Sequence, residues 1–267
     1  MLIKRLLTAL VAIPLIIFII LIFESTGVFL IISLVVVVAL YEYLSFLYHE
    51  KINIQIIAHI LLGLMFPFAF FFGFPDLVIP VLAFVFVLVM AFSLFRVTDP
   101  KKKAENLFIR VFGIFYVAFL LSFLIPISEL DFGVKWVILA IAVNFLTDAG
   151  GYFAGRILGR HRLHPVVSPK KTVEGSAGGV LVCIIGILIC KYVFFNELEY
   201  WDVLAIGIGG SVLAILGDLV ESLIKRGFAV KDAGGLLPGH GGFLDRIDSF
   251  VFTLPYIYYY AAIIYKV

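Results

Sequence analysis

Charged residues are scarce in this chain: Asp, Glu, Lys and Arg make up 14% of its 267 residues, whereas 63% are hydrophobic. The mean hydropathy is +1.17, and 28 residues are Phe. A water-soluble core could not bury so much apolar surface, so the composition excludes a soluble protein and favours a membrane protein. A nucleic-acid-binding signature is also absent, and we expect no nucleic acid among the partners.

Cysteine is nearly absent as well. Cys183 and Cys190 are seven residues apart in an apolar run, where a helix would place their α-carbons too far apart for a disulfide. We therefore interpret both as small hydrophobic residues. The first apolar run lacks an A-x-A cleavage pattern before Glu24, which favours an uncleaved helix over a signal peptide.

Nine apolar runs are long enough to cross about 30 Å of hydrocarbon. They cover residues 6–23, 27–47, 54–72, 77–95, 107–127, 134–154, 176–195, 203–222 and 250–265. We therefore predict an all-α polytopic membrane protein with about nine transmembrane helices. The predicted domains are an N-terminal membrane domain (1–73), a middle membrane domain (74–128) and a C-terminal catalytic domain (129–267). The sixth helix could join the middle domain in a dimer interface.

The distribution of basic residues indicates the orientation. With the N-terminus in the cytoplasm, 17 of the 20 Lys and Arg residues lie on the cytoplasmic side. We predict that the chain lies in a bacterial inner membrane with a cytoplasmic N-terminus and active site and with its C-terminus on the other side. The basic loop 96–110 is expected to fix this topology and contact anionic lipid. Glu42, in the second run, is expected to snorkel or to pair with another helix rather than to catalyse.

The densest polar stretch covers residues 222–248 and reads SLIKRGFAVKDAGGLLPGHGGFLDRID. Asp245 and Asp248 are three residues apart, so a helical turn projects both carboxylates from one face. Together with Asp218 just upstream, they offer the hard oxygen ligands that suit Mg²⁺. Arg246, between the two, would face another direction and pair with a carboxylate or a phosphate.

Two other polar segments precede this stretch. Asn144 and Asp148 share a helix face, and a carboxylate at that depth indicates a functional site, unless it serves helix packing. Residues 168–175 read SPKKTVEG, which puts two lysines and two hydroxyls before a helix that begins near Gly175. This arrangement suits phosphate binding, although a loop that only fixes topology would look similar. Together the segments indicate phosphoryl or nucleotidyl transfer at a membrane surface.

These residues resemble the signature of the phosphatidate cytidylyltransferases, also called CDP-diacylglycerol synthases. That signature reads S-x-x-K-R-x(4)-K-D-x-G/S/A-x(2)-L/I-P-G-H-G-G-x-x-D-R-x-D, and residues 222–248 follow it in register. The segments DAGGYFAGR and SPKKTVEG are similar to the family's DTGAYFxGR and SPxKTWEG, with departures at Ala149, Gly151 and Val173. The likeness covers residues 144–249 in motif detail, and the first half matches only as hydrophobic helices.

The resemblance implies that CTP and phosphatidic acid give CDP-diacylglycerol and pyrophosphate, in a homodimer surrounded by membrane lipid. It implies Mg²⁺ as the cofactor and leaves a second cation open. The implied catalytic residues are Asp218, Lys225, Arg226, Asp245 and Asp248, with Asp218, Asp245 and Asp248 as metal ligands. The implied substrate-binding residues are Asp148, Ser168, Lys170, Lys171, Thr172, Lys231, Asp232, His240, Gly241, Gly242 and Arg246. A polar cytoplasmic cavity among the last four helices, open sideways to lipid, would hold both substrates.

Two other functions fit parts of the pattern. A CTP-dependent lipid-alcohol kinase uses related polar motifs but would transfer the γ-phosphoryl group, and the complete signature argues against it. A transporter would also carry intramembrane charges. Transporters usually show repeat symmetry and broken helices at the midplane, whereas the charges of this chain gather on one side and no fixed-period repeat is found.

Overall fold

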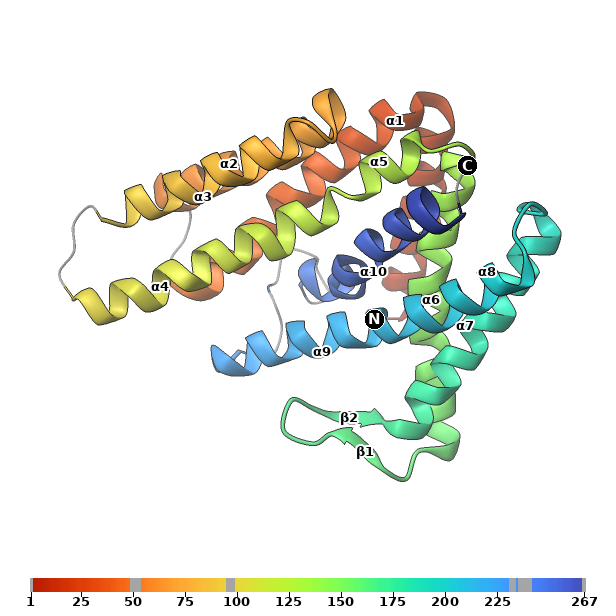
Figure 1. The fold of residues 1–267 in the computed structure, drawn as a ribbon. Helices are drawn as coiled ribbons and strands as arrows, with labels where there is room; N and C mark the ends of the chain where they lie inside the picture. Colours follow the sequence, from red (N-terminus) through yellow and green to blue (C-terminus); the bar gives the residue numbers. More distant parts are fainter. Residues whose placement is uncertain (1, 49–53, 95–98, 231–233, 235–241, 266–267) are drawn as a thin grey trace. The chain divides into compact units, whose positions relative to one another are not determined.

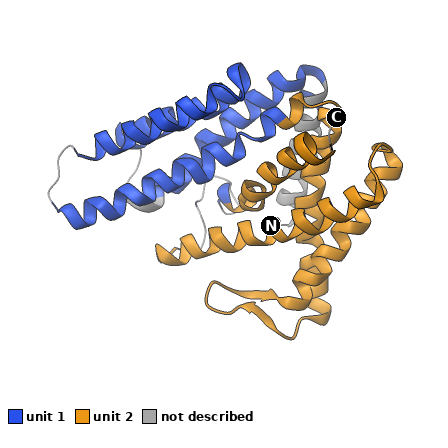
Figure 2. Ribbon diagram, viewed as in Figure 1, with its two compact units in different colours: residues 1–126, 232–244 blue, residues 127–231, 245–267 orange. Residues whose placement is uncertain are grey.

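The structure is a computed structural model that describes residues 2–48, 54–94, 99–230, 234 and 242–265 (Figure 1). The chain forms two compact units (Figure 2). Unit 1 contains residues 1–126 and 232–244, and unit 2 contains residues 127–231 and 245–267. The division into three domains stays a prediction.

Unit 1 consists of helices. These are α1 (Leu2–Tyr48), α2 (Ile54–Gly73), α3 (Val78–Ser93), α4 (Pro100–Gly113), a π-helical segment (Ile114–Phe119) and the first residues of α5 (Leu124–Glu129). The expected break between the first two apolar runs falls in α1 at Glu24, whose backbone is not helical (φ 47°, ψ −129°). Phe66 and Phe70 of α2 pack on Phe119, with ring centroids 5.4 and 5.8 Å away, and Phe123 extends this aromatic core.

The prediction of a loop over residues 96–110 is wrong from Pro100 onward, where α4 begins. The Asp99 carboxylate accepts hydrogen bonds from the backbone N–H groups of Lys101 (3.0 Å) and Lys102 (3.3 Å). Such an N-cap, followed by proline at the first helical position, satisfies exposed donors and starts a helix even in a basic sequence.

Unit 2 holds the second half of the chain. Its elements are α6 (Gly133–Leu158), β1 (Arg162–His164), β2 (Ser168–Thr172), α7 (Val173–Val193), α8 (Tyr200–Ala205), a π-helical segment (Ile206–Gly210), α9 (Ser211–Gly227), the 3₁₀ turn Leu244–Arg246 at the unit boundary, α10 (Asp248–Tyr259) and a final π-helical segment (Tyr260–Tyr265). The two strands pair antiparallel, so the loop expected after the sixth run is a β-hairpin. Cys183 and Cys190 are free thiols, as predicted, and Cys183 is fully buried.

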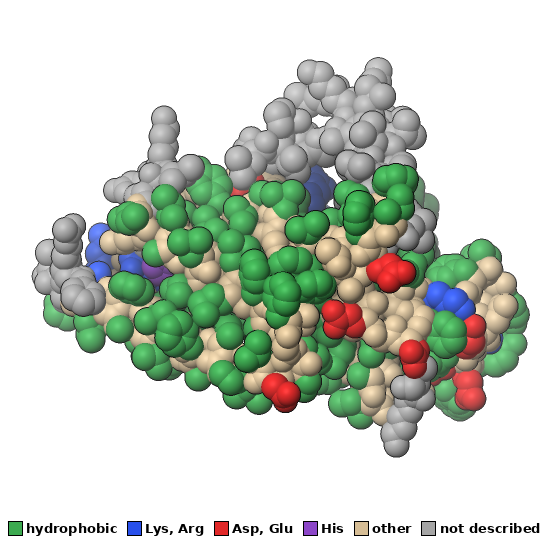
Figure 3. Space-filling model, turned by 90° about the horizontal axis from the view of Figure 1, so that it is seen from above, with side chains coloured by type: hydrophobic (Ala, Val, Ile, Leu, Met, Phe, Trp, Pro, Cys, Tyr) green, Lys and Arg blue, Asp and Glu red, His purple; other side chains and the backbone are tan. Residues whose placement is uncertain are grey.

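The fold is that of an α-helical membrane protein. In the described part of the chain, six helical segments are long and apolar enough to cross a membrane: Ile22–Ser45, Ile54–Gly73, Pro100–Glu129, Gly133–Leu158, Val173–Val193 and Tyr200–Gly227. Their large apolar side chains often face outward: Phe72 is 66% exposed and Tyr192 61%. Hydrophobic side chains cover much of the face shown in Figure 3, as contact with lipid requires.

Candidate active site

Small residues bring α6 and α7 into close contact. A Cβ atom added at Gly178 would lie 2.1 Å from the Cβ of Ala154, and one added at Gly179 would lie 2.8 Å from the carbonyl oxygen of Thr147. Only glycine fits at such a distance from another backbone, as in other close crossings of membrane helices. Towards the end of α6, Gly151 and Gly155 of α6 and Gly175 of α7 line a pocket.

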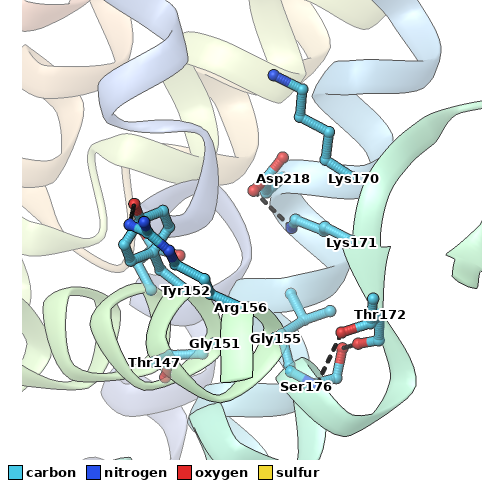
Figure 4. A pocket seen from close by; sticks show the side chains of 13 residues that line it. Thr147, Gly151, Tyr152, Gly155, Arg156, Lys170, Lys171, Thr172, Ser176 and Asp218 are labelled. Carbon is cyan, nitrogen blue, oxygen red and sulfur yellow. Dashed lines mark hydrogen bonds and ion pairs between the residues drawn. The ribbon is translucent and has the colours of Figure 1, made fainter. Parts of the chain in front are cut away.

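This pocket has a volume of about 430 Å³ and lies within unit 2 (Figure 4). Its walls come from α6, β2, α7 and α9. The lining residues that the sequence predicted are Asp148, Lys170, Lys171, Thr172 and Asp218. Ser176 also lines it, as do Tyr152 and Arg156 of the DAGGYFAGR motif, although the sequence assigned none of the three an individual role. The volume and the mixture of apolar surface with a few polar groups are typical of a small-molecule site.

Two side chains fix the hairpin that carries the lysine pair. The Glu174 carboxylate accepts hydrogen bonds from the backbone N–H groups of Arg160 (3.0 Å) and His161 (3.2 Å), one residue before β1. Thr172 caps α7, because its Oγ1 accepts a hydrogen bond from the N–H of Gly175 at 3.1 Å. Since β2 runs directly into α7, these bonds hold Lys170 and Lys171 at the pocket. Neither Glu174 nor the hairpin was predicted.

Two carboxylates, Asp148 and Asp218, line the pocket together with the cations Arg156, Lys170 and Lys171. Lys171 Nζ lies 2.5 Å from Asp218 Oδ2, and Figure 4 shows this ion pair in the pocket. The carboxylates of Asp148 and Asp248 are close enough to Asp218 to interact with it electrostatically. Burial, followed by the negative charge of Asp218, raises the pKa of Asp248 well above its ordinary value.

A second group of charges lies further along α9. Lys225 Nζ is 2.5 Å from Asp245 Oδ1 and also pairs with Glu221, one helical turn before it. All three side chains are largely buried, with 12% of Lys225, 15% of Asp245 and 1% of Glu221 exposed. Glu221 had no predicted role, although its i, i+4 spacing from Lys225 was a signal that could have found it.

The other predicted residues have different surroundings. Arg226 and Arg246 are exposed, Ser168 is half-buried at the start of β2, and Gly242 is buried. Lys231, Asp232, His240 and Gly241 lie outside the described residues. Asn144 serves packing, since its Nδ2 donates to Thr253 Oγ1 at 2.9 Å.

Of the two roles predicted for Glu42, in unit 1, snorkelling is wrong. Glu42 is 2% exposed, and its Oε2 accepts a hydrogen bond from the backbone N–H of Leu244 at 2.8 Å. A buried carboxylate on α1 thus holds the backbone next to the DRID segment. Leu244, just before the DRID segment (residues 245–248), therefore has a hydrogen-bond partner far away in the sequence.

Two of the three predicted metal ligands, Asp218 and Asp248, are suited to hold a divalent cation. Within the described ranges, no group of three His, Cys, Asp or Glu side chains is arranged to hold one ion. Of the three predicted ligands, Asp245 pairs with Lys225, while Asp218 and Asp248 interact with each other. Mg²⁺ commonly takes one or two carboxylates and completes its shell with phosphate and water, so Asp218 and Asp248 are a sufficient protein contribution.

Comparison with known proteins gives a consistent result. The model of the cytidylyltransferase family matches residues 3–264. The phosphatidate cytidylyltransferase of Bacillus subtilis (strain 168) is 43% identical over 149 residues, which is 55% of each chain. Those of Staphylococcus haemolyticus (strain JCSC1435) and Staphylococcus aureus (strain COL) are 42% and 38% identical over 172 and 170 residues, covering 63% of this chain and 65% of theirs. The chain therefore spans less than two thirds of these relatives in the matched regions. Because the family model covers nearly the whole sequence, the chain belongs to the cytidylyltransferase family.

Proposed function

We propose that this protein transfers the cytidylyl group of CTP to phosphatidic acid, giving CDP-diacylglycerol and pyrophosphate. The observation that carries the proposal is the pocket in which Lys171 pairs with Asp218 beside Asp148, at the end of a membrane-spanning helix. Cations beside a carboxylate cluster suit a polyphosphate substrate that brings its own counter-ion. The names of the relatives, phosphatidate cytidylyltransferase, support the same substrates.

The reaction needs little from the protein besides positioning and charge. A phosphate oxygen of phosphatidic acid attacks the α-phosphorus of CTP in line, and the bond to the β-phosphate oxygen breaks as pyrophosphate leaves. This oxygen is already anionic, so no general base is required. Lys171 can leave Asp218 to bind a phosphate oxygen, and Lys170, Lys225 and Arg226 stabilise negative charge on the substrates.

Asp218 and Asp248 would hold the Mg²⁺, with Asp245 as the third predicted ligand. When bound, Mg²⁺ would supply charge neutralisation for the triphosphate and for the departing pyrophosphate. Because Asp245 pairs with Lys225, its role as a ligand stays a prediction. A second cation stays a prediction.

The remaining architecture belongs to the same proposal. The enzyme would have about nine transmembrane helices, a cytoplasmic N-terminus and a C-terminus on the other side of a bacterial inner membrane. The active site would open to the cytoplasm for CTP and sideways to the bilayer for lipid. Two copies would form a homodimer.

Labelled CTP tests the reaction directly. Detergent-purified protein would receive phosphatidic acid, Mg²⁺ and CTP labelled at either the α- or the γ-phosphate. We expect α-label in the lipid, lost in Asp218→Asn and Asp245→Asn and kept in the control Asp131→Asn, an exposed residue outside the pocket. Label from the γ-phosphate would instead establish a lipid kinase, and an absence of labelled lipid from folded protein would exclude both enzymes.

A further inference from the structure

Two unassigned residues of the pocket form a pair at the end of α6. Arg156 and Tyr152 are one helical turn apart, and Arg156 Nη1 donates a hydrogen bond to the Tyr152 hydroxyl at 3.2 Å. Both line the pocket. In Figure 4 they lie together on one side of it, with Lys171 and Asp218 on the other. The pocket therefore has two separate polar regions.

The helix turns that carry this pair also expose a stripe of apolar side chains. Phe153, Ile157 and Leu158 are 62%, 77% and 62% exposed. On a helix, residues 153 and 157 form the stripe next to residues 152 and 156. A lipid that lies along this apolar stripe would bring its headgroup to Tyr152 and Arg156. Tyrosine and arginine at the end of a membrane-spanning helix are well suited to that depth, where an apolar body meets a polar end.

The charge of Arg156 is available for a ligand. Among the residues that the structure describes, its guanidinium forms no ion pair, and its hydrogen bond to Tyr152 uses one of five donors. Lys171, by contrast, is neutralised by Asp218. A planar guanidinium binds two oxygens of one phosphate group, which a lysine cannot do in the same geometry.

We infer that Arg156, oriented by Tyr152, binds the phosphate monoester of the lipid substrate, whereas the region around Lys171 and Asp218 receives the nucleotide. This inference rests on the proposed function and assigns its two phosphate-bearing substrates to opposite sides of one pocket. It makes Arg156 a residue that determines specificity for the lipid.

Steady-state kinetics can separate the two sides. Full-length protein in mixed micelles would be assayed with phosphatidic acid varied at saturating CTP and with CTP varied at saturating lipid. Arg156→Ala should raise the KM for phosphatidic acid by about tenfold or more, as expected for the loss of a charge-assisted bond, and change the KM for CTP by less than about twofold. Arg156→Lys should have an intermediate effect, and Tyr152→Phe should raise the KM for lipid a few fold. The control Arg162→Ala removes an exposed cation of β1 that does not line the pocket and should leave both values unchanged.

Two further measurements distinguish lipid binding by Arg156 from other causes of a raised KM. Thermal unfolding of each variant establishes that it is folded. Binding of short-chain phosphatidic acid without CTP, followed by calorimetry, should weaken in Arg156→Ala, and phosphatidylglycerol, a phosphate diester, should compete poorly with it in the wild type. Equal competition by phosphatidylglycerol would mean a general contact with anionic lipid and would overturn the inference. So would an equal rise of both KM values, or a larger rise for CTP. If the wild type forms no CDP-lipid, the proposed function fails, while the binding measurement still tests Arg156.

Discussion

Replacing Lys225 with methionine should destabilise the protein, because Lys225 is the cation between two buried carboxylates. The change keeps most of the apolar stem but removes the ammonium that pairs with Asp245 and Glu221. Removing one partner of a buried ion pair typically costs about 3–5 kcal/mol. Asp245, at 15% exposure, can regain some hydration, so we expect the lower end, about 3 kcal/mol. For a chain of this size that corresponds to a fall in melting temperature of roughly 6–12 °C.

A second substitution distinguishes this explanation from a general loss of packing. Glu221→Leu removes the more deeply buried carboxylate, so the double variant Glu221→Leu/Lys225→Met should recover at least half of the lost melting temperature. It should not recover cytidylyl transfer, for which Lys225 is a predicted catalytic residue. The assay is thermal unfolding of the detergent-solubilised protein, alongside lipid labelling from CTP. Two results would contradict this explanation: a melting temperature of Lys225→Met within about 2 °C of that of the wild type, or a double variant that is less stable than Lys225→Met. Either result would mean that the unpaired carboxylates do not cause the loss of stability.

Three further predictions concern the supports of the pocket. Gly179→Ala should lower the melting temperature by several degrees, because the added Cβ would lie 2.8 Å from a backbone carbonyl oxygen of α6. Gly151→Ala should be tolerated, because the nearest atom to its added Cβ is 3.6 Å away. Equal stability of the two variants would contradict the packing described. Glu174→Ala removes the hydrogen bonds to the backbone at the start of the hairpin and should speed tryptic cleavage within it. Unchanged cleavage would show that the hairpin is stable without these bonds. Asn144→Ala should cost about 1–3 kcal/mol in unfolding experiments, since it leaves the buried Thr253 hydroxyl without this partner, and a neutral result would argue against that bond.

Much of the helical structure could be predicted because the hydrocarbon thickness sets the length of an apolar run. The runs 54–72, 134–154 and 176–195 correspond to α2, α6 and α7. The errors lie where local hydrogen bonding overrides hydropathy. Asp99 starts α4 seven residues before the apolar run begins, and Glu174 helps to form a hairpin in a basic segment without the usual turn signals. Neither effect can be seen in a hydropathy pattern.

The candidate site was predictable where its residues are neighbours on one helix or belong to one motif. Lys170, Lys171 and Asp148 line one pocket, while their roles in substrate binding stay predictions. Asp218 reaches Lys171 across 47 residues of sequence, and no local pattern predicts which lysine of the pair it meets. Tyr152 and Arg156 were visible as an i, i+4 pair within a recognised motif, yet the role that we infer for them depends on the exposed apolar stripe beside them. That relation requires knowing which side of α6 packs against α7.

The close contact between α6 and α7 limits how the pocket could change to exclude an inhibitor. A compound that contacts Gly175 could hardly be excluded by a substitution at that position, because a Cβ added there would lie 2.9 Å from the carbonyl oxygen of Gly151. Resistance would arise more readily at other lining residues, such as Tyr152, Arg156 and Lys170. If Arg156 and Lys170 bind the substrates, every such change would also reduce turnover. An inhibitor that rests against Gly175 would leave the protein few substitutions that both exclude the compound and keep the proposed reaction.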